Sequence, residues 1–313
     1  MTAPGSAPQG TTEAAANPHI CVCVCTYKRP EYLAPLLTAL CAQETEGRFT
    51  HSISIVDNDH LESARAVVSD FAAKAPLAIS YDVEPRQNIA LARNRTVANA
   101  TGEFLAMIDD DEEPFPDWLL RLFEAMLAYA PDGVLGPVIP RFLSPPPDWA
   151  VRGRCFERPS PRTGTVLRWK QTRTGNVLIR RAVFDDPANR FRAEFRFGGE
   201  DVDFFRRQIA GGRRFVWCAE AKVHECIPSE RCSRRYLLKR ALLRAGHPSS
   251  QGWAILLTSF VAIPAYAVVL PFLFISRHRS FMRHLMGMCG HIGRVLAFVG
   301  GSLWEKIMPP GRA

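Results

Sequence analysis

Three consecutive carboxylates, Asp109, Asp110 and Asp111, are the residues of this sequence with the clearest chemical potential. They come directly after Glu103–Ile108, an apolar run typical of a buried strand. Carboxylates two positions apart can reach one hard cation, and Mg²⁺ or Mn²⁺ favours oxygen ligands shared with the phosphates of a substrate. A solvated acidic turn is the alternative for such a triplet taken alone. Its place at a strand end, with Asp57 at a neighbouring strand end, favours a ligand site.

Alternating strand and helix patterns surround these carboxylates in the first half of the chain. The predicted strands are Ile20–Cys25, Ile53–Val56, Ile79–Val83 and Glu103–Ile108, and the predicted helices between them are Pro30–Cys41, Leu61–Lys74 and Asn88–Ala100. This order predicts a doubly wound α/β domain, whose ligands bind outside the carboxyl ends of the strands. The residues just after the first strand, among them Thr26, Tyr27 and Arg29, should therefore share one sheet edge with the aspartates.

The second half of the chain is basic and less regular. Its predicted elements, which come after a stiff break at Pro145–Pro147, are a strand at Asn176–Ile179, a helix at Asp201–Ile209, a strand at Arg214–Cys218 and a basic helix at Ser233–Ala245. Residues 1–145 carry a net charge of −9 and residues 146–313 a net charge of +17, which together give +8. Such a basic half needs an anionic partner: a nucleic acid, a phosphorylated ligand or a membrane surface.

Several function classes lack their sequence signals. No G-x-G-x-x-G follows the first strand and no G-x-x-x-x-G-K-[ST] occurs, so the dinucleotide-binding and P-loop motifs are unsupported. No basic–aromatic RNA motif occurs either, and we expect no nucleic-acid partner. Cys21, Cys23 and Cys25 alternate along the first strand without CxxC or Cys/His spacing. This favours three small apolar side chains packed under a helix over a metal site.

The beginning of the chain predicts a tail rather than a folded segment. Residues 1–19 are rich in Pro, Gly, Ala and Thr and contain no apolar core, which predicts a disordered tail without a secretory signal. The nine cysteines then indicate a reducing, cytosolic setting for the soluble part.

The C-terminal region is apolar. Trp253–Ile275 is a run of 23 residues without charge, long enough to span a bilayer, with a buried soluble helix as the alternative. A second apolar stretch, Leu285–Gly301, contains His291 and Arg294 and favours a surface-lying amphipathic helix at least as much as a span. Lys and Arg flank the first run on both sides, so the positive-inside rule gives no orientation. A kinked re-entrant helix with both ends cytosolic is the hypothesis that best fits these charges.

Four motifs, in this order, resemble the family 2 glycosyltransferases of the GT-A fold: CTYKRP, IVDND, NIALARNRTVANATGEFLAMIDDDEEP and FGGEDVDFFRRQIAGG. The resemblance covers Ile20–Leu243 and is strongest with bacterial exopolysaccharide enzymes, including succinoglycan-type glucosyltransferases. It implies a mixed sheet with flanking helices over residues 20–245. The tail of residues 1–19 would precede this domain, and a membrane-associated region of residues 246–313 would come after it.

The resemblance also implies roles for individual residues. Thr26, with Tyr27 and Arg29 beside it, would contact the nucleotide, Asp57 would bind the uracil, and Arg93 would lie near the base and phosphates. Asp109 or Asp110 would meet the ribose or sugar, and Asp111, or Asp109 in the other alignment of the triplet, would ligate Mg²⁺ or Mn²⁺. His224 would reach the metal or diphosphate, unless it is an ordinary structural histidine.

The pair Glu200 and Asp201 matches the motif in which the family's Asp deprotonates the acceptor hydroxyl. Chemistry supports this role, because inverting transfer needs a carboxylate on the face opposite the leaving diphosphate. The alternative is that both acids merely favour a helix N-terminus. The guanidinium groups of Arg231, Arg234 and Arg235 would suit a diphosphate, or form a solvated basic face.

The sequence therefore predicts an inverting, metal-dependent glycosyltransferase that takes a nucleotide-diphosphate sugar, a UDP-sugar in our interpretation. The acceptor would be a lipid-linked or polysaccharide hydroxyl, and the enzyme would act on the cytoplasmic face of a bacterial inner membrane. The Gln-x-x-Arg-Trp signature of processive synthases is not present, which favours the addition of one sugar. A nucleotidyltransferase and a non-catalytic, membrane-tethered nucleotide-sugar-binding protein are the alternatives. The donor sugar, acceptor, linkage and oligomeric state are left open.

Overall fold

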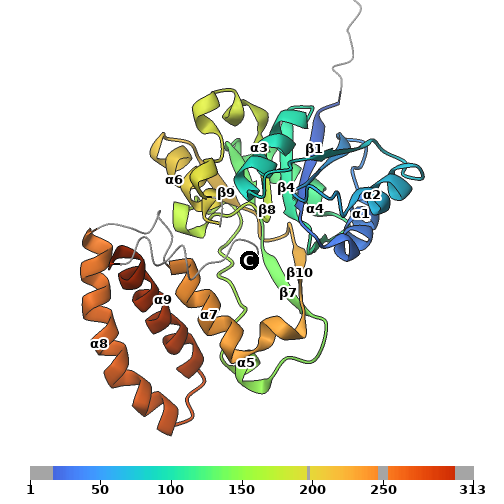
Figure 1. Ribbon diagram of the computed structural model, residues 1–313. Helices are drawn as coiled ribbons and strands as arrows, with labels where there is room; N and C mark the ends of the chain where they lie inside the picture. The colour runs from blue at the N-terminus through green and yellow to red at the C-terminus, as the bar shows by residue number, and fades with distance from the viewer. Residues whose placement is uncertain (1–16, 196–197, 246–252, 300–313) are drawn as a thin grey trace, which may run out of the picture.

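The computed structural model describes residues 17–195, 198–245 and 253–299 (Figure 1). Most of the predicted tail, residues 1–16, lies outside the described residues. The end of that prediction is wrong, because Asn17 donates a side-chain hydrogen bond to the Gly47 carbonyl and β1 begins at His19. The folded domain therefore starts slightly earlier than composition indicates.

A seven-stranded sheet forms the centre of the domain, in the order β3-β2-β1-β4-β8-β6-β9. Its strands are β1 (His19–Thr26), β2 (Thr50–Asp57), β3 (Ile79–Val83), β4 (Phe104–Asp109), β6 (Gly133–Leu135), β8 (Asn176–Arg180) and β9 (Phe215–Trp217). Only β8 runs antiparallel to its neighbours β4 and β6, so the sheet is mixed, as the resemblance implied. The four N-terminal strands and three of their helices were predicted, with ends shifted by a few residues.

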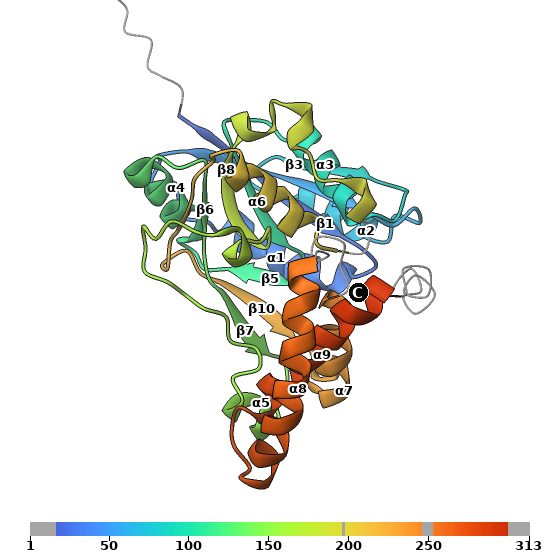
Figure 2. The same cartoon turned by 90° about the vertical axis from the view of Figure 1, so that its left-hand side faces the viewer.

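Helices cover both faces of this sheet (Figures 1 and 2). This is expected because β1 has apolar side chains on both of its faces. The helices of the domain are α1 (Leu33–Cys41), α2 (Arg65–Ala72), α3 (Ile89–Asn99), α4 (Trp118–Tyr129), α5 (Asp148–Arg152) and α6 (Glu200–Ala210), of which the short α5 lies away from this sheet (Figure 1). Ile20, Val22 and Val24 join the apolar cluster that contains α1 and α4. Cys21 and Cys23 point the other way, into the cluster with residues of α3 and α6. This confirms the prediction that these two cysteines pack under a helix.

A second, three-stranded sheet was not predicted. It has the order β5-β10-β7 and consists of β5 (Glu112–Pro114), β10 (Val223–Ile227) and β7 (Val138–Phe142). Its strands have three to five residues and mostly polar or Pro-containing sequences, so no alternation marked them. Only two residues separate the end of β4 from the start of β5, so the small sheet begins directly after the acidic end of β4.

Three C-terminal helices lie beside the α/β domain (Figure 2). They are α7 (Arg234–Ala245), α8 (Trp253–Ile275) and α9 (Phe281–Val299). Within α8, Leu256–Ile275 is long and apolar enough to cross a membrane, and only 17% of its most apolar window is buried. The alternative of a buried soluble helix is therefore wrong. α8 is one continuous helix through Pro264 and Pro271, and the hypothesis of a kinked re-entrant helix with both ends cytosolic stays a prediction.

Candidate active site

The predicted polar residues gather at one edge of the main sheet. Thr26 at the end of β1 pairs in register with Asp57 at the end of β2, and Cys25 pairs with Asp109 at the end of β4. The ends of three adjacent parallel strands thus bring the nucleotide-binding candidates together. This is the edge where α/β sheets bind ligands.

Asp110 is buried and holds the loop after β1 in place. It accepts a 2.8 Å hydrogen bond from the Thr26 hydroxyl, and the Arg29 guanidinium lies 2.7 Å from its other oxygen. Burial raises the pKa of Asp110 to about 7, although Arg29 and Thr26 oppose this rise. Asp110 is thus an internal anchor of the site, whereas Tyr27 lies partly exposed beside it.

Asp109 and Asp111 lie on either side of this anchor, with different exposures. The side chain of Asp109 is 47% exposed and lies 3.2 Å from the guanidinium of Arg93. The side chain of Asp111 is 10% exposed, and one of its oxygens accepts 3.0 Å hydrogen bonds from both Arg29 and Arg231. Burial, and then the charges of Asp111, Asp201 and Glu225, raise the pKa of Asp109 against the effect of Arg93. These carboxylates are close enough to repel one another.

Glu112 is a member of this cluster that the sequence analysis did not assign. It is buried, it accepts a 3.1 Å hydrogen bond from the Asp109 amide, and burial followed by the charges of Asp109 and Asp111 raises its pKa. A Cβ atom on Gly175 would lie 2.7 Å from Glu112 Oε1 and 2.9 Å from Asp109 Oδ2. Gly175 thus keeps open a small space bordered by two carboxylates.

The residues at this space fit a hard divalent cation. Their donor atoms are carboxylate oxygens, which Mg²⁺ and Mn²⁺ prefer, and a cation would relieve the repulsion that raises the pKa of Glu112. Among the described residues, no group of three or more His, Cys, Asp or Glu is arranged to hold a metal by itself. Mg²⁺ in proteins is commonly held by one or two carboxylates, with water and substrate phosphate as its other ligands.

Asp57 is fully buried, and its carboxylate is already occupied. Its Oδ1 accepts a hydrogen bond from the Asp59 amide, and its Oδ2 accepts from the Ala64 amide and the Tyr81 hydroxyl, all at 2.8 to 3.0 Å. Asp57 therefore shapes the loop after β2. Its predicted contact with a uracil would have to replace or share one of these bonds, and it stays a prediction.

Arg93 connects two halves of the site. From α3 it pairs with Asp109 at the end of β4 and with the buried Glu200 at the start of α6. Glu200 is thus a partner of Arg93 through Oε1, whereas its buried Oε2 has no hydrogen-bond partner among the described residues, and its predicted catalytic role stays a prediction. The bridge fixes the first turn of α6 against the sheet edge.

Asp201 comes next to Glu200 in the chain and is partly exposed. Its only hydrogen bond within the described structure comes from the Val202 amide to Oδ1, and no cation pairs with it there. Gly198 and Gly199 precede it with φ of +111° and +82°, in the left-handed region that favours glycine. Its charge raises the pKa of Asp109 and counteracts the lowering of the pKa of Arg173, so it lies near both. Asp201 is therefore a partly exposed carboxylate of the site without a cation partner among the described residues.

His224 makes no contact with the carboxylate cluster in the described structure, and its predicted role at the metal or diphosphate stays a prediction. Alternation along β10 puts His224 on the opposite face of the small sheet from Glu225. Its ring lies 4.8 Å from that of Phe115, and burial together with the charge of Arg141 lowers its pKa. Its neighbour Glu225 faces the site instead, where it pairs with Arg158.

Arg231 and Arg234 also lie in different surroundings, although both were predicted to bind the diphosphate. Arg231 points to the cluster, 3.0 Å from Asp111 and 3.9 Å from Glu225. The guanidinium of Arg234 lies 5.2 Å from the centre of the Trp149 ring and so ties α7 to α5. The structure therefore does not place Arg234 with the predicted diphosphate ligands.

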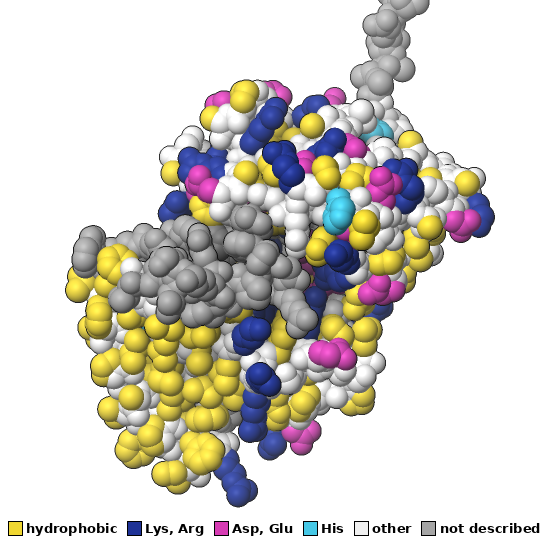
Figure 3. Space-filling model, viewed as in Figure 1, with side chains coloured by type: hydrophobic (Ala, Val, Ile, Leu, Met, Phe, Trp, Pro, Cys, Tyr) yellow, Lys and Arg dark blue, Asp and Glu magenta, His cyan; other side chains and the backbone are white. Residues whose placement is uncertain are grey.

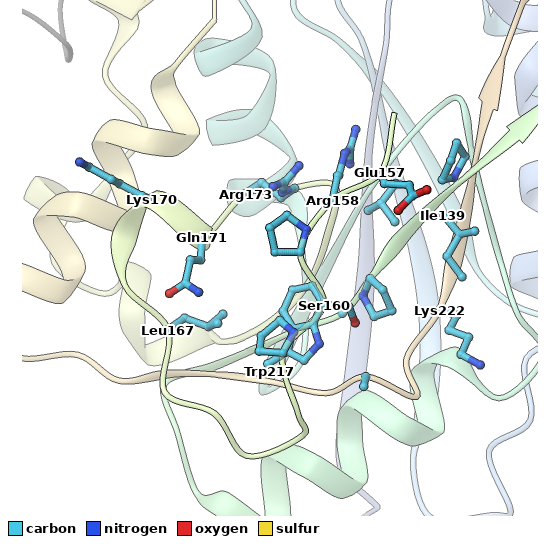
Figure 4. Close-up of a pocket in the computed structure, with 17 residues that line it drawn as sticks. Ile139, Glu157, Arg158, Ser160, Leu167, Lys170, Gln171, Arg173, Trp217 and Lys222 are labelled. Carbon is cyan, nitrogen blue, oxygen red and sulfur yellow. The ribbon is translucent and has the colours of Figure 1, made fainter. Parts of the chain in front are cut away.

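A cavity of about 320 Å³ opens at the same sheet edge, beyond β8 (Figure 4). Its apolar side includes Leu167 and Trp217, and its lining cations are Arg158, Lys170, Arg173 and Lys222. Burial, and then the charge of Arg158, lower the pKa of Arg173. The Arg173 side chain makes no hydrogen bond or ion pair within the described chain. Sequence reasoning missed Arg158, Arg173 and Glu225. The basic, irregular composition before β8 was the signal for the two arginines, and no signal marked Glu225.

Comparison with known proteins agrees with this geometry. The family model described as "Glycosyl transferase family 2" matches residues 21–194. The succinoglycan biosynthesis protein ExoM of Rhizobium meliloti (strain 1021) is 37% identical over 253 residues, which cover 76% of this chain and 80% of that protein.

Solved structures share the fold at low sequence identity. The mannosyltransferase PcManGT from Pyrobaculum calidifontis, solved with GDP-Man and Mn²⁺, is 17% identical with a TM-score of 0.63, over 93% of this chain and 89% of that one. TarS of S. aureus, residues 1–349, solved with UDP, is 18% identical with a TM-score of 0.52, over 72% of this chain. The match spans 64% of that TarS chain, less than two thirds of its length. A further TarS structure contains UDP-GlcNAc. These likenesses confirm the predicted fold class.

Proposed function

The chain belongs to glycosyltransferase family 2 and is a glycosyltransferase, and from this premise we propose an inverting transfer of one sugar from a nucleotide-diphosphate donor to an acceptor hydroxyl. One observation carries the proposal: Asp109, Asp111 and the cation-free Asp201 converge on one edge of the sheet. Family membership sets aside the nucleotidyltransferase and the non-catalytic binding protein considered above.

The proposed donor is a UDP-sugar, held at the ends of β1, β2 and β4. Relatives of the same fold were solved with UDP, UDP-GlcNAc and GDP-Man, which supports a nucleotide-diphosphate sugar as the class. Arg29 and Arg231 both lie 3.0 Å from Asp111 and could turn toward a diphosphate. Guanidinium groups suit phosphate oxygens because their N–H groups match them in pairs.

Asp111 and Asp109 would hold Mg²⁺ or Mn²⁺ together with the donor diphosphate, and buried Glu112 would support them. The bound cation would supply neutralisation of the charge that develops on the leaving diphosphate. The Mn²⁺ in the PcManGT structure supports a divalent metal as the class. Which metal serves this chain is part of the proposal to be tested.

Asp201 would act as the base. In the proposed step its carboxylate takes the proton of the acceptor hydroxyl, and the acceptor oxygen forms a bond to the anomeric carbon. The bond from that carbon to the diphosphate oxygen breaks on the opposite face, and the electron pair leaves with the diphosphate. Arg93 and Glu200 would position Asp201 through the first turn of α6.

The proposed acceptor enters through the cavity beyond β8, because Arg173 lines that cavity and is close enough to Asp201 for the two charges to interact. Trp217 and Leu167 offer an apolar wall for a sugar face, and the four lining cations offer contacts for an anionic acceptor. A lipid-diphosphate-linked glycan combines both properties. The kinship with a succinoglycan biosynthesis protein supports exopolysaccharide synthesis as the setting.

We place this reaction at the cytoplasmic face of a bacterial inner membrane. The apolar α8 supports membrane association. The nine cysteines are free, as expected in a reducing compartment.

The test is a donor screen with Asp201→Asn as the diagnostic variant. Protein in membrane fractions is incubated with UDP- and GDP-sugars, Mn²⁺ or Mg²⁺ and a lipid extract, and release of nucleotide diphosphate and product anomeric configuration are measured. Asp201→Asn should lower turnover about 10²- to 10⁴-fold, the usual contribution of a general base, and leave donor binding intact.

Asp70→Asn on α2 is the matched control, because this exposed carboxylate pairs only with Lys74 at the surface. It should behave as wild type. Unchanged turnover in Asp201→Asn, or a product that retains the donor configuration, would reject Asp201 as the base of an inverting reaction.

A further inference from the structure

The outer face of α8 is apolar along the whole helix. Large apolar side chains recur on it at helical spacing, between 64% and 79% exposed, namely Leu257, Val261, Val268, Phe272 and Ile275. Figure 3 shows this hydrophobic surface over the C-terminal helices. So extensive an exposed apolar surface indicates a binding face for another apolar phase or molecule.

The inner face of α8 is attached to the catalytic domain through two further helices. Ser259 on α8 lies 3.0 Å from the His291 ring nitrogen on α9. α9 in turn packs closely on α7, since a Cβ atom on Gly293 would lie 2.1 Å from the Leu242 carbonyl oxygen. The order outward from the catalytic domain is therefore α7, α9 and α8.

The turn between α8 and α9 is docked on the catalytic domain as well. The Arg283 guanidinium lies 3.4 Å from the carbonyl oxygens of Gly153 and Arg154, directly after α5. A Cβ atom on Gly153 would lie 3.3 Å from the Arg279 carbonyl oxygen. Figures 1 and 2 both show the far end of the hairpin beside α5.

These contacts are incompatible with α8 as a simple membrane span. A 23-residue helix is about 35 Å long, enough to cross the hydrocarbon core. If α8 crossed, its Ile275 end and the turn would lie on the opposite side from the catalytic domain. The turn contacts α5, which belongs to that domain, so α8 must stay on one side unless those contacts break.

We propose that the α8–α9 hairpin is a monotopic membrane dock. The apolar stripe of α8 enters one leaflet of an anionic bilayer, and the turn stays on the side of the catalytic domain. This deepens the membrane location proposed above and does not depend on which sugar is transferred.

Charge identifies the partner as an anionic lipid surface. Between Glu230 and Glu305 the chain has ten Lys and Arg and no Asp or Glu. Figure 3 shows Lys and Arg side chains in a row along the edge of the hydrophobic face. Arg277 and Arg279 are exposed at the turn. Apolar insertion flanked by basic residues is the arrangement by which interfacial helices bind anionic leaflets.

The first experiment measures binding of the purified full chain to vesicles of phosphatidylcholine, with and without phosphatidylglycerol, by flotation. Wild type should float with the anionic vesicles, and Val268→Asp should lose about tenfold in binding because a charge then faces the hydrocarbon. Val166→Asp is the matched control, a 56% exposed valine on the catalytic domain. It should bind as wild type.

Val261→Asp repeats the test at a second stripe position, and far-UV circular dichroism checks that each variant is folded. Equal flotation of folded Val268→Asp, Val261→Asp and wild type would overturn the lipid-binding role of the stripe. Failure of wild type to float with either vesicle would also overturn it. Neither result bears on sugar transfer, which is measured separately.

The second experiment decides between a dock and a span. Ser276→Cys at the turn and Ser233→Cys before α7 are labelled with a membrane-impermeant maleimide, against the wild-type background, in right-side-out and inverted inner-membrane vesicles. A monotopic dock predicts that both variants gain labelling only in inverted vesicles. Labelling of the Ser276→Cys variant in right-side-out vesicles, with the Ser233→Cys variant protected, would show that α8 spans.

Discussion

Each of the three consecutive aspartates has different surroundings, although their side chains are chemically identical. Asp110 turns inward to Thr26 and Arg29, whereas Asp109 faces the cleft and Asp111 is clamped between two arginines. The difference arises because the chain leaves β4 and enters β5 after two residues, which alternates the directions of the side chains. The residue types therefore indicate an acidic site, but the course of the backbone decides the direction in which each carboxylate points.

Gly175→Ala tests whether the space between Asp109 and Glu112 is the metal site. The new Cβ would displace at least one of these carboxylates, and disturbed support of metal ligands commonly costs 10- to 100-fold in affinity. We expect a loss of about that size in Mn²⁺-dependent donor binding, measured by calorimetry at several Mn²⁺ concentrations.

Gly211→Ala is the control for this substitution, since its Cβ would meet nothing closer than 3.4 Å. It should leave the Mn²⁺ dependence unchanged. Wild-type Mn²⁺ affinity in a folded Gly175→Ala protein would place the cation elsewhere.

His51→Gln tests a pH effect far from the site. Burial, and then the charge of His19, lower the pKa of His51, which lies 2.9 Å from the Leu40 carbonyl oxygen. The unfolded chain therefore binds more protons than the folded one as the pH falls through about 6.5, and stability drops with acidification. Melting temperatures measured between about pH 7 and pH 5 should fall less in the variant than in wild type.

His60→Gln, at a side chain that is 66% exposed, should keep the wild-type dependence on pH. If the two variants and wild type lose melting temperature equally, His51 does not contribute to acid sensitivity.

At the scale of elements, one buried side chain holds several loops at the sheet edge. Asn176, at the start of β8, accepts a 2.8 Å hydrogen bond from the Trp118 indole of α4. Its amide donates to the carbonyl oxygens of Pro137 and Ala221, which connect the large sheet to β7 and β10. The small sheet is therefore tied to the main one by polar contacts that no local pattern predicts.

Asn176→Ala should lower the free energy of unfolding by about 2–4 kcal/mol, because it removes the hydrogen-bond partner, within the described structure, of the buried Trp118 N–H and of the Ala221 carbonyl oxygen, and one of the two hydrogen bonds to the Pro137 carbonyl oxygen. Denaturant titration measures this loss. Asn99→Ala, which removes an exposed hydrogen bond to Asp82, should cost less than about 0.5 kcal/mol. Equal costs in the two variants would contradict the role of Asn176.

At the scale of the whole molecule, the acidic and the basic halves of the chain supply different parts of the site. The acidic half supplies the sheet edge with its carboxylates, and the basic half supplies Arg231 to the acidic cluster and Arg158 and Arg173 to the neighbouring cavity. Nine further Lys and Arg lie on α7 and around the hairpin, where the sequence has no Asp or Glu. Opposite charges thus meet at the sheet edge, and a surplus of positive charge lies on the side that we propose faces lipid.

Gly293→Ala tests how the hairpin is joined to the rest of the molecule. The added methyl group would collide with the Leu242 backbone, which cannot move aside without shifting α7. We expect a lower melting temperature and faster proteolysis of the segment between α7 and α8.

Gly287→Ala on the same helix is the control, because its Cβ would meet only the tip of the Tyr266 side chain, which can rotate away. Gly287→Ala should lower the melting temperature less than Gly293→Ala does. A Gly293→Ala protein as stable as Gly287→Ala would show that α9 does not depend on close contact with α7.

The sequence by itself determined the first four strands, the helices between them, α6 to α8 in outline, and the acidic site at the end of β4. These features depend on local apolar spacing and on the residue types at the end of each strand, both of which are written into contiguous residues. The family resemblance added Asp201 and the mixed sheet. The strands of the small sheet escaped prediction because each is too short to show a period.

Only the tertiary structure decided which distant residues join the site. The pairing of β10 with β5 turned Glu225 inward and His224 outward, a choice of face that one residue of register would reverse. Long-range packing brought Arg173 near Asp201, paired Arg158 with Glu225 and placed Arg234 against Trp149. It also folded the turn after α8 back onto α5, so that a helix with the length of a span lies along the domain. Such contacts join residues far apart in the chain, and spacing within a segment carries no information about them.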